Sequence, residues 1–267
     1  MYNFLQEEIN QFEKIYDDLY FNPTPQYTIQ PILQPILKKD TINGLHVFGY
    51  ESLFRVHHYK HGILPLSIPF YIYSEQFPDK YLFLTKKNLI TVFNKIKVVK
   101  PTNKVFINIS LSRDILNDSI FSLLIELLQE NKENNKRIVL EILENDKILM
   151  SQAGLKKGIK RIEQIRNKFD INIALDDYGT GNSNFDKLLY IEPDFVKIDG
   201  YFIKNITKDE KIKKIVEHLF LVCSMHNMSA IAEFVENEKI FQTVQNIGFK
   251  YFQGFFFHGR LAPVLFV

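Results

Sequence analysis

Eight short apolar runs alternate with longer stretches of helical periodicity along most of this chain. A strand-like run followed by a helical stretch, repeated many times, is typical of parallel strands with helices outside them. Eight such runs within roughly 240 residues favour a closed (βα)8 barrel over an open sheet. The runs are 32–37, 45–54, 105–109, 138–142, 171–175, 195–198, 230–232 and 249–252.

The stretches between these runs carry apolar residues at helical spacing. They are 82–97, 112–133, 146–169, 186–190, 208–226 and 236–247. Thr207 and Glu210 have the spacing of a capping box, which predicts the start of the fifth stretch. Gly248 is expected to end the sixth as a C-cap. Residues 56–81 fit neither pattern and are expected to form an irregular loop or a lobe after the second strand.

The first 26 residues precede the alternating pattern. Residues 2–20 have helical spacing, and two prolines between 21 and 26 end that helix. Two interpretations fit this helix: it caps the barrel, or it is the end of a signalling helix from an upstream domain. We therefore divide the chain into an N-terminal helix and linker at 1–26 and a barrel domain at 27–267.

Composition and charge exclude several classes of protein. The chain has 33 basic and 31 acidic residues, a net charge of +2, so a globally basic binder of polymeric nucleic acid is not expected. A single cysteine, Cys223, excludes an internal disulfide and a multi-cysteine zinc site. No apolar run reaches the ~20 residues of a membrane span. The acidic N-terminus does not resemble a signal peptide, and we expect a cytoplasmic protein.

Polar side chains stand at the carboxyl ends of most of the strand-like runs. In a barrel these ends open on one face, where active sites are built. The residues are Glu51, Asn108, Glu141, Asp176, Asp177, Lys197, Asp199, Glu233 and Gln253.

Six of these side chains offer oxygen donors to one site, and five of the six are carboxylates: Glu51, Asn108, Glu141, Asp176, Asp177 and Glu233. Five converging carboxylates cannot all stay ionised without cations between them. Oxygen donors select hard cations, here Mg²⁺ or Mn²⁺. The adjacent Asp176 and Asp177 suit two ions, the usual device for cleaving a phosphoester. Lys197 adds a fixed positive charge for a phosphate or an attacking hydroxide.

The residues at these positions resemble the motifs of a known family. YESLFR at 50–55 is similar to the Glu-Ala-Leu-x-Arg signature of EAL domains, the phosphodiesterases of the bacterial second messenger cyclic di-GMP. Further segments resemble the other EAL motifs in order: NIS at 108–110, LEILE at 140–144, LDDYGTGNSN at 175–184, VKIDGYFI at 196–203, AEFVE at 232–236 and FQGFFF at 252–257. Gln34 resembles the glutamine near the start of the domain, although Gln30 stands in the same four-residue context.

This resemblance implies a fold and a set of roles. The fold would be a modified (βα)8 barrel with one antiparallel strand, which often dimerises through the loop after Asp177. Glu51, Asn108, Glu141 and Asp176 would hold the first of two metal ions. Asp176, Asp177 and Glu233 would hold the second, with Glu233 also the candidate general base. Lys197 would orient the water or stabilise charge. Glu144 would anchor the 176–184 loop. The groove for cyclic di-GMP would be lined by Gln34, Leu53, Arg55, Asp199, Glu236 and Gln253.

The chain departs from the EAL pattern without losing a metal ligand. Ser52 replaces the signature alanine, and Phe234 replaces the glycine between Glu233 and Glu236. The expected function is hydrolysis of cyclic di-GMP to linear pGpG. The alternative is a catalytically weak module that binds cyclic di-GMP and signals through a partner. A barrel enzyme that uses metal for enolisation would need a strand-end base, for which Lys197 is the one candidate.

Overall fold

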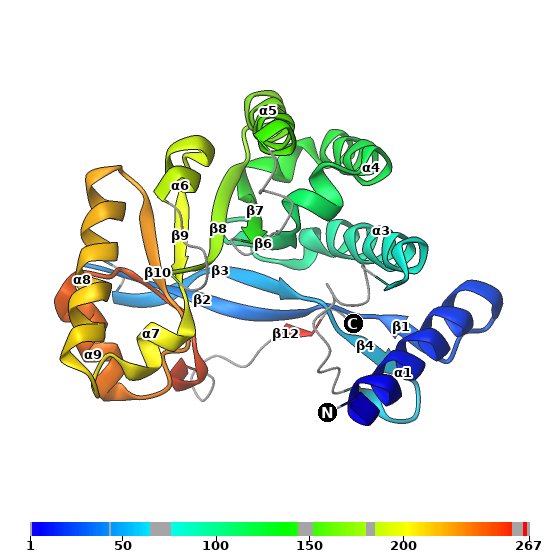
Figure 1. Ribbon diagram of the computed structural model, residues 1–267, viewed down its shortest axis with the longest axis horizontal. Helices are drawn as coiled ribbons and strands as arrows, with labels where there is room; N and C mark the ends of the chain where they lie inside the picture. The colour runs from blue at the N-terminus through cyan, green and yellow to red at the C-terminus, as the bar shows by residue number, and fades with distance from the viewer. Residues whose placement is uncertain are drawn as a thin grey trace.

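The computed structural model contains an eight-stranded closed barrel surrounded by helices (Figure 1). The structure describes residues 2–42, 44–64, 76–143, 152–179, 185–257 and 264–265. In spatial order the barrel strands are β2 (Ile32–Asp40), β3 (Gly44–Leu53), β6 (Lys104–Ile109), β7 (Ile138–Leu143), β8 (Asn172–Tyr178), β9 (Phe195–Ile198), β10 (Ser229–Ala232) and β11 (Tyr251–Phe252).

One strand of the barrel runs against its neighbours. β2 pairs antiparallel with β3 on one side and with β11 on the other, and the second pairing closes the barrel. The strands from β3 to β11 pair in parallel. β12 (Val264–Leu265) adds a short antiparallel pairing to the other end of β2. The eight apolar runs thus form the eight barrel strands, and the antiparallel strand implied by the resemblance is confirmed.

Helices cover the outside of the barrel (Figure 1). They are α3 (Pro78–Lys95), η1 (Ile96–Val98), η2 (Leu111–Ile115), α4 (Asp118–Glu130), η3 (Lys132–Arg137), α5 (Gln152–Phe169), α6 (Phe185–Ile191), α7 (Gly200–Asn205), α8 (Glu210–Met225), α9 (Glu238–Ile247) and η5 (Phe255–Phe257). The stretch 112–133 is not one helix, because Ser110 and Asn117 each cap a new turn with their side chains.

Two predicted helix ends can be compared with the structure. The capping box at Thr207 is wrong: Asp209 is the N-cap of α8, and its side chain accepts a hydrogen bond from the backbone N–H of Lys211. Gly248 is the C-cap of α9 as expected, with a φ of 123° that glycine adopts without strain.

A small second sheet lies beside the barrel and packs against α1 (Tyr2–Phe21), as Figure 1 shows at the N-terminal end. It consists of β1 (Tyr27–Ile29), β4 (Val56–His58) and β5 (Gly62–Ile63). Ile15 of α1, Val56 of β4 and Leu84 of α3 are fully buried in one apolar cluster. The alternative of an irregular loop over 56–81 is therefore wrong at both ends, where β4, β5 and the start of α3 form. The alternative of a lobe agrees with the small sheet to which β4 and β5 belong. Residues 65–75 lie outside the described residues.

The barrel interior is filled by a layer of apolar side chains. Alternate residues of a strand point to opposite faces. The inward layer is Ile36, Phe106, Val139, Ala174, Phe195 and Ile231, with Phe48 and Tyr251 packed against it. On each of the parallel strands β6 to β11, the residue two positions beyond this layer is polar and again points inward. The apolar layer therefore forms the floor of the polar site.

No helix among the described residues is both long and apolar enough to span a bilayer.

Candidate active site

The ammonium group of Lys197 lies at the centre of the polar layer. Its Nζ is 2.8 Å from Asp176 Oδ1, 2.9 Å from Glu233 Oε1, 3.1 Å from Glu141 Oε1 and 3.3 Å from Glu51 Oε1. The Lys197 side chain is 1% exposed, so water does not screen these contacts. One lysine thus contacts carboxylates from four different strand ends.

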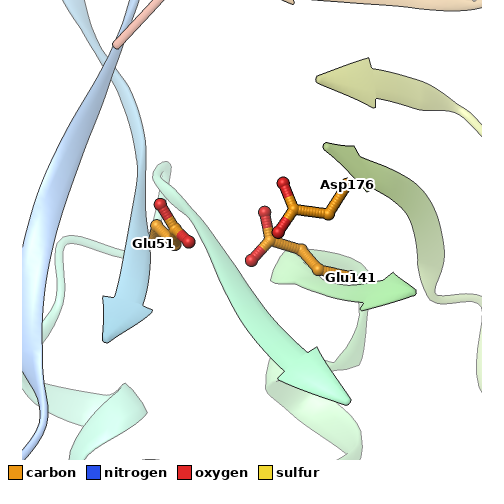
Figure 2. A group of neighbouring side chains, drawn as sticks. All are labelled: Glu51, Glu141 and Asp176. Atoms are coloured by element: carbon orange, nitrogen blue, oxygen red, sulfur yellow. The ribbon is translucent and has the colours of Figure 1, made fainter. Parts of the chain in front are cut away.

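The carboxylates also converge on one another. Glu51, Glu141 and Asp176 each offer an oxygen within 4.8 Å of the others, and so do Asp176, Asp177 and Glu233. Figure 2 shows the first group: the side chains leave three separate strands and point toward a common space. Asp176 belongs to both groups and can therefore bridge two neighbouring cations.

Two successive residues of β8 reach this site because the strand is irregular there. The pairing of β8 with β9 shifts register between Leu175 and Tyr178. Asp177 lies in this shift with a φ of 55°, a left-handed conformation that aspartate tolerates better than most residues. The break in strand alternation lets Asp176 and Asp177 both line the same cavity.

Amide side chains surround the carboxylates. Gln253 donates hydrogen bonds from Nε2 to Glu51 Oε2 and, over 3.1 Å, to Gln34 Oε1. Gln34 and Glu51 are direct partners in the β2–β3 pairing, which sets their side chains next to each other. Asn108 Nδ2 donates to Asp176 Oδ2 over 3.4 Å from the exposed rim. These contacts fix the orientation of the carboxylates.

Burial and mutual repulsion shift the titration of the cluster. Burial raises the pKa of the Glu141 and Glu233 carboxyls well above the usual range, although Lys197 opposes the shift. Burial and the neighbouring Asp176 raise the pKa of Asp177 to about 7. Burial alone would lower the pKa of Lys197, but the carboxylates, Asp176 first, raise it well above its usual value. Lys197 is therefore charged at neutral pH.

The donor set fits divalent cations. Five carboxylates and one ammonium group leave an excess of four negative charges when all are ionised, and two divalent ions would neutralise that excess. Glu141 Oε2 and Glu233 Oε2 are buried and have no hydrogen-bond partner. Buried acceptors of this kind are normally satisfied. The carboxylate oxygens suit hard ions such as Mg²⁺, Mn²⁺ or Ca²⁺.

A cavity of about 490 Å³ opens over this cluster. It is lined by Ile32, Gln34, Glu51, Leu53, Arg55, Asp176, Asp177, Lys197, Glu233, Phe234, Gln253, Gly254 and Phe255. Of these, Ile32, Gly254 and Phe255 were not singled out in the sequence. Phe255 could have been found from its place two residues after Gln253 in FQGFFF.

Four other predicted site residues among those described do not line the cavity. Asn108 and Glu141 contact the carboxylate and ammonium groups of the site but are not part of the cavity wall. Asp199 is the N-cap of α7 and accepts from the backbone N–H of Tyr201 over 2.7 Å. Glu236 pairs with Lys204 over 3.4 Å on the surface. Glu144 and residues 180–184 of the predicted loop lie outside the described residues.

Comparison with known proteins identifies the family. The model of the EAL domain matches residues 26–259 of this chain. The chain belongs to the EAL-domain family.

Curated relatives of this EAL chain are cyclic di-GMP phosphodiesterases by name. PdeB of Shewanella oneidensis is 38% identical over 108 residues, which are 40% of this chain and 12% of the relative. PdeA of Borreliella burgdorferi is 34% identical over 142 residues, 48% of this chain and 21% of the relative. PdeL of Escherichia coli is 26% identical over 243 residues, 86% of this chain and 62% of the relative. The matches thus span less than two thirds of each relative's length.

Solved structures share the EAL fold of this chain. An EAL-domain protein from Listeria monocytogenes superposes with a TM-score of 0.74 at 21% identity, covering 94% of this chain and 93% of the other. The Bacillus subtilis YkuI protein, crystallised with cyclic di-GMP and calcium, gives a TM-score of 0.70 at 20% identity, covering 96% of this chain and 58% of the other. These similarities support the barrel fold.

Proposed function

We propose that this chain is a metal-dependent phosphodiesterase that hydrolyses cyclic di-GMP to linear pGpG. The observation that carries the proposal is the set of five carboxylates around Lys197, whose excess charge matches two divalent cations. The names of the curated EAL relatives support the same substrate.

The two groups of oxygen donors suggest how two Mg²⁺ or Mn²⁺ ions would be held. Glu51, Glu141 and Asp176 would hold the first ion, and a half-turn of the Asn108 amide would add its oxygen. Asp176, Asp177 and Glu233 would hold the second ion. Glu144 would anchor the loop that follows Asp177.

The chemistry is addition of water to phosphorus and loss of the 3′ oxygen. Bound divalent cations would polarise the phosphate and make a bound water more acidic. Glu233 is placed to accept the proton of the attacking water, because its Oε2 is buried and without a partner. Lys197 keeps the carboxylates in position and adds positive charge beside the phosphate. The P–O3′ bond then breaks, and the 3′ oxygen takes a proton from solvent.

The cavity wall suits a dinucleotide. Leu53 and Ile32 offer apolar surface to a base, and Arg55 and Gln34 offer hydrogen bonds. Gln253 joins Gln34 to Glu51 at the base of the wall. Asp199 and Glu236 remain proposed contacts beyond the cavity wall.

The wider organisation is also a proposal. Residues 1–26 would be an N-terminal helix and linker before a barrel domain at 27–267. The barrel would form a homodimer through the loop after Asp177, act in the cytoplasm, and respond to an upstream sensory domain or a partner.

The experiment is turnover of cyclic di-GMP by the Glu233→Gln variant. The substitution keeps the shape of the side chain and removes its basicity, so we expect a loss of at least ~10²-fold in kcat. Glu238→Gln, on the exposed start of α9, is the matched control and should turn over like the wild type. Turnover by Glu233→Gln within a few-fold of the wild type would contradict the assignment.

A receptor is the second candidate function, and Phe234 favours it because its ring lines the cavity next to Glu233. A wild-type protein that binds cyclic di-GMP tightly with Mg²⁺ and Mn²⁺ yet forms no pGpG would establish the receptor and overturn the phosphodiesterase.

A further inference from the structure

Phe234 combines a strained backbone with an exposed aromatic ring. Its φ is 48°, in the left-handed region that aromatic residues rarely adopt. The residue is 42% exposed and does not belong to the apolar core clusters. The ring also lines the cavity directly after Glu233. The backbone conformation of Phe234 costs energy, and its partly exposed ring recovers little of that cost through burial. This combination points to a role other than stability.

The backbone around Phe234 is held firmly on the side away from solvent. The N–H of Val235 donates to the carbonyl of Gln253 over 2.9 Å, and the N–H of Phe256 donates to the carbonyl of Val235 over 3.0 Å. Gly254 lies so close that a Cβ there would be 2.2 Å from Val235 O. These contacts fix the direction in which the Phe234 side chain leaves the backbone.

Helix α7 supports the ring from one side. A methyl group added to Gly200 would lie 2.1 Å from Phe234 Cδ2, so the ring fits only because residue 200 is glycine. Lys204 Nζ lies 4.1 Å from the centre of the ring, within the range of a cation–π contact. Gly200 and Lys204 are four residues apart and share one face of α7, so both approach the ring from the same side. The opposite face of the Phe234 ring therefore faces the cavity.

We propose that the free face of Phe234 stacks on a guanine base of cyclic di-GMP, with Gly200 as the position that makes room for the ring. This inference rests on the proposed substrate. Base–aromatic stacking needs a flat, partly exposed ring whose orientation is already fixed, and Phe234 meets both conditions. The phosphate would lie over the carboxylates and Lys197, with the stacked base beside Glu233.

The first test compares Phe234→Asn with Phe234→Tyr. Asparagine tolerates the left-handed backbone but has no ring, whereas tyrosine keeps the ring. We expect Phe234→Asn to raise the Kd for cyclic di-GMP, titrated with Ca²⁺, by ~5- to ~100-fold, the range for loss of one stacking contact. In Mg²⁺ its KM should rise by a similar factor with little change in kcat. Phe234→Tyr should bind like the wild type, as should Tyr201→Asn, which removes an exposed ring of α7 outside the cavity wall.

The second test uses Gly200→Ala. The new methyl group should push the Phe234 ring aside and weaken binding as Phe234→Asn does. In the Phe234→Asn background the same alanine should leave the Kd unchanged, because no ring remains to displace. Alanine favours helix more than glycine does, so the melting temperature of the double variant should not fall below that of Phe234→Asn. A purely structural role of the ring would not produce this dependence of one substitution on the other.

The outcomes separate the inference from the proposed function. A Kd for Phe234→Asn within about twofold of the wild type, or a higher kcat/KM that shows the ring to be an obstruction, would overturn stacking while leaving the phosphodiesterase intact. Binding without turnover by the wild type would overturn the phosphodiesterase, and the Kd values would still decide stacking. A wild type that neither binds nor cleaves cyclic di-GMP would overturn both.

Discussion

Removal of the Lys197 ammonium group should make the fold depend on divalent cations. Its Nζ contacts carboxylates from Glu51, Glu141, Asp176 and Glu233 within 3.3 Å. Lys197→Met keeps the length and apolar stem of the side chain but leaves these buried carboxylates without their ammonium partner. Breaking a buried ion pair in this way costs about 3–5 kcal/mol.

That cost converts to a fall in melting temperature of roughly 6–20 °C, at ~2–4 °C per kcal/mol for a chain of this size. The fall should appear in full when EDTA removes divalent cations. Mg²⁺ or Mn²⁺ should recover most of it, because the cations replace the missing positive charge among the carboxylates.

The assay is thermal unfolding by circular dichroism, with and without Mn²⁺, of the wild type, Lys197→Met and Lys213→Met. Lys213 is the surface control. Its Nζ lies 3.8 Å from Glu210 Oε1 and 3.9 Å from Glu217 Oε1, and surface pairs of this kind contribute about 0–1 kcal/mol. A wild-type melting temperature for Lys197→Met in EDTA, or equal stabilisation of all three proteins by Mn²⁺, would refute the reasoning.

Two further predictions concern groups outside the site. Arg137 is buried and donates hydrogen bonds to the backbone carbonyls of Val99, Lys100 and Asn103. Arg137→Ala should therefore lower the free energy of unfolding in urea by ~3 kcal/mol or more and leave kcat unchanged, and Arg137→Lys should recover only part of that loss. A loss below ~1 kcal/mol for Arg137→Ala would contradict this role. Burial raises the pKa of the Cys223 thiol to about 12. At pH 8 the native protein should therefore not react with a disulfide reagent until it unfolds. Rapid labelling of the native protein would count against the buried placement of Cys223.

The barrel could be predicted from the sequence because its signal is local. Each strand is an apolar run such as 105–109 or 138–142, bounded by helical spacing on either side. The convergence of Glu51, Glu141 and Asp176 followed from one topological rule, that parallel strands end on the same face. That one strand runs antiparallel came from the family resemblance alone, since direction leaves no mark in the apolar pattern. The resemblance did not say which strand it is, and the structure shows that it is β2.

Other features depend on contacts distant in the sequence. β1 and β4 pair although about 30 residues separate them along the chain. Neither strand is long enough to show the alternation of apolar and polar residues by which a strand is predicted. The sequence shows Phe234 as an unusual residue at its position in the motif. Its contact with Gly200 could not be predicted from the sequence, because it depends on how α7 packs against the end of β10. The start of α8 at Asp209 instead of Thr207 reflects a choice between two nearby capping residues, which spacing alone does not decide.

The central claim is that the carboxylates around Lys197 hold divalent cations that cleave cyclic di-GMP. The direct measurement is chromatographic analysis of the products after wild-type protein, first stripped with EDTA, is incubated with cyclic di-GMP and either Mg²⁺, Mn²⁺ or no added cation. We predict accumulation of linear pGpG with at least one of the two cations and none without them. Intact cyclic di-GMP in every reaction, or equal hydrolysis in the cation-free one, would contradict the account.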